Sequence, residues 1–193
     1  MNSAAHTDIR PPAALLTDCV VGIGSFHGDD RAGWEVIDRL QLRLGGGSQL
    51  AFRKAAVPHD VLDWLDPGLR LHLVDACAAD VSGVQRLELR FSAPGQLAFS
   101  GQPNQDCCTG GQAACGPDDE ITRRFAALRS RSTHQFDLLT TLELASALGC
   151  LPARLTLWTI AIDSAQPNAE IGPAAGTRVI QCADRIEQEL AHA

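Results

Sequence analysis

Hydrophobic and polar residues follow two spacings along this chain, and the spacings predict strands and helices in turn. Continuous apolar runs, typical of strands covered on both faces, occupy residues 19–23, 71–76 and 155–162. Residues 50–57 suit a further strand, and residues 84–91 alternate between apolar and polar types, which predicts an edge or antiparallel strand. The pattern therefore predicts about five strands.

Helical spacing appears between these strands. Trp34, Val36, Ile37, Leu40 and Leu44 recur at the period of a helix, and three glycines follow them. The same signals predict helices at residues 34–44, 60–65, 136–148 and 175–190. Because strands and helices alternate, we expect an α/β three-layer sandwich: a twisted, mostly parallel sheet with helices on both faces.

The chain divides into one domain and two irregular segments. Residues 1–17 contain two adjacent prolines and little periodicity, which predicts a flexible N-terminal tail. Residues 18–193 form a single α/β domain, and within it Gly, Pro, Gln, Asn and Cys replace the periodic apolar residues at 92–130. We interpret 92–130 as an insertion loop.

Composition and charge narrow the classes of function. At 193 residues and 45% hydrophobic, the chain has enough apolar material for a sizeable core. A net charge of −7 argues against binding nucleic acid, which draws on clustered Lys and Arg. The chain contains no apolar stretch of membrane-spanning length and no signal-peptide pattern, so we expect a cytoplasmic protein that does not bind membranes.

Acidic residues follow two of the predicted strands. Asp29 and Asp30 come after the first strand and its glycine-rich turn, and Asp75 ends the third strand. In a parallel sheet, ligands bind beyond the carboxyl ends of the strands, where these acids would meet. His134 precedes the helix predicted at 136–148. Two carboxylates and an imidazole from separate segments suit a divalent metal such as Ni²⁺ or Zn²⁺.

Each of these residues also has a simpler interpretation. Asp29 or Asp30 suits the N-cap of the following helix, although a cap needs one acid and not two. Asp75 is compatible with the start of a turn, and His134 with a surface position near a helix end. The arrangement of the three segments taken together favours a metal site over these simpler interpretations.

Three stretches together resemble the [NiFe] hydrogenase maturation endopeptidases. They are GIGSFHGDDRAGW at residues 22–34, LHLVDA at 71–76, and STHQFDLLTTLELASALGCLPARLTLWTIAI at 132–162. The resemblance extends from about residue 19 to about residue 172, with the insertion loop outside it. It implies an α/β endopeptidase that removes a C-terminal extension from the large-subunit precursor of a hydrogenase after nickel has been inserted.

The resemblance also implies roles for individual residues. Asp30, Asp75 and His134 become the metal-binding and catalytic residues of an aspartic-type metal-dependent hydrolase. The residues implied to support the loop are Gly24, Ser25, Asp29 and Gly33. The resemblance further implies that the metal is nickel carried by the substrate and not a permanently bound cofactor, and that the partner is the hydrogenase precursor. Consistent with this, the sequence contains no Ser or Cys nucleophile in a recognisable motif with a base.

Two other functions remain open at this point. A non-catalytic nickel-sensing assembly factor would use the same three ligands without cutting. A nucleotide-binding module is less favoured, because Gly22, Gly24 and Gly28 have the spacing G-x-G-x-x-x-G and two acids would repel phosphates there.

The insertion loop contains its own candidates for metal binding. Cys107, Cys108 and Cys115 do not have the pair spacing of structural zinc sites. We therefore expect a mobile loop near the substrate entry, with exposed thiols, in preference to a second metal site.

Overall fold

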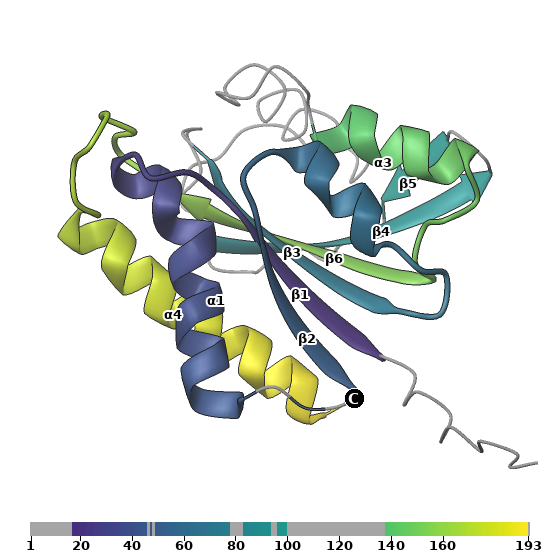
Figure 1. Cartoon of the computed structure of the whole chain (residues 1–193), viewed down its shortest axis with the longest axis horizontal. Helices are drawn as coiled ribbons and strands as arrows, with labels where there is room; N and C mark the ends of the chain where they lie inside the picture. Colours follow the sequence, from purple (N-terminus) through teal and green to yellow (C-terminus); the bar gives the residue numbers. More distant parts are fainter. Residues whose placement is uncertain are drawn as a thin grey trace, which may run out of the picture.

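A six-stranded sheet in the order β2-β1-β3-β6-β4-β5 forms the centre of the molecule (Figure 1). The computed structural model describes residues 17–45, 47, 49–77, 83–93, 96–99 and 138–192. The parallel strands are β1 (Asp18–Ile23), β2 (Leu50–Ala55), β3 (Arg70–Cys77) and β6 (Arg154–Ala161). Strand β4 (Val84–Ala93) is antiparallel to β6, and β5 (Gln96–Phe99) is antiparallel to β4.

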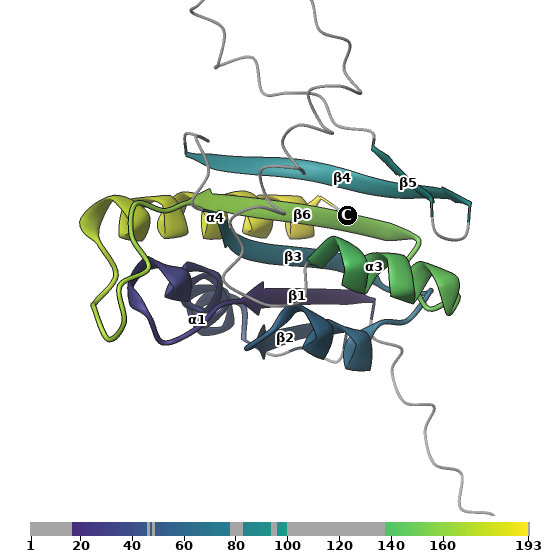
Figure 2. The same cartoon turned by 90° about the horizontal axis from the view of Figure 1, so that it is seen from above.

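Helices cover both faces of this sheet and give the molecule its three layers (Figure 2). One face packs against α1 (Ala32–Leu44) and α4 (Pro173–Ala191), the other against the 3-10 helix η2 (Pro58–Trp64) and α3 (Leu138–Ala147). A short 3-10 helix, η1 (Gly28–Arg31), precedes α1. No helix in the described residues has both the length and the apolar character that crossing a membrane demands.

The core consists of two apolar clusters, one on each face of the sheet. Alternate residues of β3 contribute to opposite clusters: Leu71 and Leu73 lie with α3, and Val74 lies with α1 and α4. This double burial is the reason that β1, β3 and β6 read as continuous apolar runs in the sequence. The expected α/β sandwich with a mostly parallel sheet is confirmed.

The structure changes two of the expected boundaries. The sheet has one strand more than the five that the pattern indicated, because residues 96–99 form β5. Strand β4 is also longer than expected and includes residues 92–93. These residues start the segment interpreted as an insertion loop; residues 100–137 lie outside the described residues. Thr17, assigned to the tail, bonds to the domain instead: its N–H donates to the Gln49 carbonyl (2.9 Å). Residues 1–16 are outside the described part.

Two glycines bring the start of α1 into close contact with the end of β1. A Cβ on Gly33 would lie 2.1 Å from the carbonyl oxygen of Ile23 and 2.9 Å from that of Val74. A Cβ on Gly22 would lie 2.2 Å from the Gly33 carbonyl oxygen. Side chains do not fit at these distances, so glycine at both positions lets the helix begin directly against the strands. The contact sets the position of η1 at the carboxyl end of the sheet.

Candidate functional site

The loop that carries Asp30 folds back on itself at the carboxyl end of β1. Gly24 N–H donates to the Ala55 carbonyl at the end of β2 (3.1 Å), and Ser25 N–H donates to the Asp30 carbonyl (3.3 Å). The Ser25 hydroxyl donates a short hydrogen bond to the Asp30 carboxylate. Gly28, with φ of +52°, adopts the left-handed conformation that starts η1. These contacts hold the Asp30 side chain, which is 7% exposed, at the strand end.

The neighbouring acid, Asp29, has different contacts. Its carboxylate accepts the backbone N–H of Gly172 (2.6 Å) and the N–H groups of Asp163 and Ser164 (3.3 Å each). Gly172 is the N-cap residue of α4, so the Asp29 carboxylate also lies near the positive end of that helix. The carboxylate thus satisfies three backbone donors in a second loop.

That second loop, residues 163–172, was not assigned to the site by the sequence analysis. It follows β6 and lies beside the loop after β1 at one end of the sheet (Figure 1, left). Backbone bonds join the two loops: Gly28 N–H donates to the Ala169 carbonyl and Asp29 N–H to the Ser164 carbonyl, both at 3.1 Å. The position of this loop after a predicted parallel strand could have indicated its place, because any segment that follows a parallel strand starts at the same end of the sheet.

Asp75 lies at the carboxyl end of β3, next to β1. Strand register pairs Gly22 with Val74, so Asp75 is one residue beyond the last pair of these strands. The 3-10 helix η1, which carries Asp30, contacts β3 directly. The structure therefore brings Asp30 and Asp75 to the same end of the sheet, as the sequence analysis expected. By strand alternation, half-buried Asp75 lies on the face of Leu73, which is covered by α3.

The third expected ligand, His134, lies outside the described residues. Helix α3 begins four positions later, at Leu138, and runs back along the sheet, so that its first turn is nearer the carboxyl ends of the strands than its last (Figure 2). Among the residues that the structure describes, no three His, Cys, Asp or Glu side chains form a group able to hold a metal ion. Cys107, Cys108 and Cys115 also lie outside that part of the chain.

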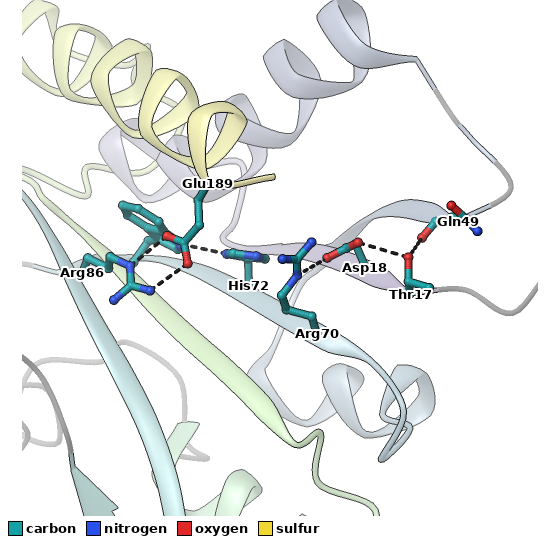
Figure 3. A network of polar contacts seen from close by, with 8 residues as sticks. Thr17, Asp18, Gln49, Arg70, His72, Arg86 and Glu189 are labelled. Carbon is teal, nitrogen blue, oxygen red and sulfur yellow. Dashed lines mark hydrogen bonds and ion pairs between the residues drawn. The ribbon is translucent and has the colours of Figure 1, made fainter. Parts of the chain in front are cut away.

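A second polar cluster extends from the amino-terminal end of the sheet towards its middle (Figure 3). Arg70 at the start of β3 pairs with Asp18 at the start of β1. Arg86 of β4 and Glu189 of α4 form a two-point ion pair, with N–O distances of 2.8 and 2.7 Å. His72 lies between the two pairs and is fully buried.

The imidazole of His72 is neutral near pH 7. Its Nδ1 accepts the indole N–H of Trp158 (3.3 Å), so the proton of the neutral ring resides on Nε2. Burial lowers the pKa of His72 from 6.5 to about 4, because the charged ring would lose its hydration; the Glu189 carboxylate partly opposes this shift. We assign this cluster to stability, since its contacts link strands β1, β3, β4 and β6 with helix α4.

Known proteins resemble the chain in structure. The hydrogenase maturating endopeptidase HybD from E. coli superposes with a TM-score of 0.62 at 16% identity, covering 92% of this chain and 93% of that one. The [NiFe] hydrogenase maturation protease HybD from Thermococcus kodakarensis gives a TM-score of 0.56 at 15% identity, covering 90% and 98%. The hydrogenase 2 maturation peptidase from a Thaumarchaeota archaeon gives 0.52 at 17%, covering 91% and 98%.

The likeness does not extend to a match in sequence. A scan against protein-family models finds no match, and a search of the curated proteins finds none either. The structural matches nevertheless cover nearly the whole length of both chains. This chain therefore has the fold of the hydrogenase maturation proteases.

Proposed function

We propose that this protein is an endopeptidase that removes the C-terminal extension of a [NiFe] hydrogenase large-subunit precursor after nickel insertion. The observation that carries the proposal is the location of Asp30 and Asp75 at the same, carboxyl end of a sheet with this fold. The structural matches named as hydrogenase maturation proteases support the reaction class.

The two carboxylates suit a substrate that brings its own cation. Like charges gathered at one end of a sheet repel each other, and a cation relieves that repulsion. Carboxylate oxygens and a histidine nitrogen are ligands that a borderline ion such as Ni²⁺ accepts. In the proposal, nickel belongs to the precursor, and Asp30, Asp75 and His134 recognise it.

The roles of the residues follow from their surroundings. Asp30 is held by the Ser25 hydroxyl and by the turn of η1, so its carboxylate needs little reorganisation when the precursor docks. A carboxylate at this position orients the scissile peptide and activates a water molecule that attacks its carbonyl. The buried Asp29 holds the loop from the other side through backbone donors.

A cleavage assay tests the proposal directly. The nickel-loaded large-subunit precursor of the same organism is incubated with the wild-type chain and with His134→Ala, beside the nickel-free precursor. We expect shortening with nickel and with His134, and none when either is missing. The control is Asp63→Asn on η2, an exposed acid on the other face of the sheet from α1, which should cut at the wild-type rate.

The same assay separates the proposal from its alternative. A nickel-loaded precursor that binds and keeps its full length in every arm would overturn the endopeptidase and favour a nickel-sensing assembly factor. Cleavage of the nickel-free precursor at the same rate would support the peptidase activity and contradict its dependence on nickel.

A further inference from the structure

An exposed aromatic ring lies on the loop that carries Asp30. Phe26 is 71% exposed, although apolar side chains of this size normally lie inside a protein. It follows Ser25, whose hydroxyl binds the Asp30 carboxylate, and precedes His27, whose ring nitrogen Nδ1 accepts the Asn168 N–H at 3.4 Å. Both neighbours of Phe26 are therefore fixed in the candidate site.

The ring of Phe26 is held in place from below. It packs edge-on against Trp34, with the ring centroids 4.7 Å apart and the planes at 80°. The indole N–H of Trp34 in turn donates to the Ala55 carbonyl at the end of β2 (2.8 Å). The Phe26 ring is thus supported by the first turn of α1, which is itself bonded to the end of β2. A ring held in advance loses little freedom when a partner covers it, which favours binding.

The charges beside the aromatic pair cancel. Lys54 lies with its ammonium 6.0 Å from the centroid of the Trp34 ring, and its Nζ is 2.6 Å from the Asp38 carboxylate. An exposed ring beside a paired charge fits an apolar side chain better than a charged one. Aromatic residues, phenylalanine included, are enriched in the cores of protein interfaces.

We propose that Phe26, supported by Trp34, is the docking contact for an apolar side chain of the hydrogenase precursor, and that it sets the position of the precursor beside Asp30. This inference rests on the proposed function and adds a specificity residue to it. The argument for this occupant is continuity with the candidate site: Ser25, the residue before Phe26, binds both the carboxylate and the carbonyl of Asp30, so the exposed ring lies beside the position where the precursor would be held.

The test compares Phe26→Ala with a matched control. Leu42 is 87% exposed and lies near the other end of α1, roughly 15 Å along the helix axis from its first residue, so Leu42→Ala removes an exposed apolar side chain away from the loop. With the nickel-loaded precursor as substrate, we expect Phe26→Ala to raise KM about tenfold with kcat unchanged. Phe26→Leu should recover part of the loss, and Leu42→Ala should equal wild type.

The outcomes separate this inference from the function on which it rests. Thermal unfolding of each variant confirms that the fold is intact. If the wild-type chain cuts the precursor and Phe26→Ala has the same KM, the docking role is overturned and the function stands. If the wild-type chain does not cut the precursor, the proposed endopeptidase function is wrong. The docking role is then tested by the dissociation constants of wild type and Phe26→Ala for the same precursor, and equal values would contradict it. An equal loss for Leu42→Ala also counts against it.

Discussion

Charged side chains are neutralised in different ways at the carboxyl end of the sheet and in the cluster around His72. At the carboxyl end, the Asp29 carboxylate binds three backbone N–H groups of the 163–172 loop. In the other cluster, which extends from the amino end towards the middle of the sheet, the charges meet in side-chain pairs, Asp18 with Arg70 and Arg86 with Glu189, around a neutral His72.

This difference in how charges are neutralised distinguishes the candidate functional site from a part of the protein that contributes stability. Backbone donors fix the path of two loops and leave the next carboxylate, Asp30, to be aimed by Ser25. Ion pairs between side chains join β1 to β3 and β4 to α4, and the opposite charges of each pair neutralise each other. We infer that substitutions at the carboxyl end change processing and loop structure, and that substitutions at the amino end change stability and its dependence on pH.

The adjacent acids give the largest expected effect. Asp30→Asn should lower the rate of precursor cleavage by at least about 100-fold, the usual contribution of a general base, with little change in the free energy of unfolding. Asp29→Asn should instead cost about 2 kcal/mol of stability, because an NH2 group replaces one of the two buried oxygens that accept backbone N–H groups. Cleavage kinetics and urea denaturation of both variants measure the two quantities. A stable Asp29→Asn that cuts as poorly as Asp30→Asn would reverse these roles.

The close approach of α1 to β1 gives the next largest effect. Gly33→Ala should cost about 3 kcal/mol or more in the free energy of unfolding, since its Cβ would overlap the Ile23 carbonyl oxygen and move the start of α1 away from the strand end. Gly176→Ala in α4 is the matched control, because a Cβ there meets nothing within 4 Å. It should stabilise the protein by about 0.5–1 kcal/mol, as alanine does in a helix. Equal urea midpoints for the two variants would contradict the close contact.

The amino-terminal cluster gives a smaller effect that depends on pH. The pKa of His72 is about 4 in the folded state and 6.5 when the ring is exposed, so in this window the unfolded chain binds the extra proton. Stability contributed by the neutral ring is complete above pH 6.5 and falls as the pH decreases toward 4. Between pH 6.5 and 5 the loss should be about 2 kcal/mol.

Urea denaturation at several pH values, compared between wild type and His72→Gln, isolates this contribution. Glutamine does not titrate, and its carbonyl oxygen can still accept the Trp158 indole N–H. The difference in unfolding free energy between the two proteins should therefore change across this pH range. A constant difference would mean that His72 is solvated or already charged in the folded protein.

Most of the fold was predictable from local patterns. Strands β1, β3 and β6 lie where continuous apolar runs predicted them, because strands covered on both faces need apolar residues at every position. Helix α1 begins at Ala32, two residues earlier than the periodicity indicated, because Gly33 contributes contact by its lack of a side chain and carries no hydrophobic signal. Strand β5 was not predicted because four residues are too few to show a periodic pattern, and the strand is defined by its pairing with β4.

The candidate site was predictable in part. The positions of Asp30 and Asp75 after parallel strands predicted their common end of the sheet, since strand direction alone sets it. The loop at 163–172 obeyed the same rule, but it contains no chemical motif that drew attention to it. The role of His134 stays a prediction. Phe26 carried no signal at all, because exposure of a single aromatic residue cannot be read from the sequence.

The sequence by itself determined the order of the elements, the layers of the sandwich and the acids at the strand ends, because these follow from periodicities of a few residues and from strand direction. Only the tertiary structure decided how each charge is neutralised. Asp29 meets its donor Gly172 across 143 positions of sequence, and His72 meets Trp158 across 86. Such contacts leave no local pattern, since they depend on which segments the completed sheet brings together.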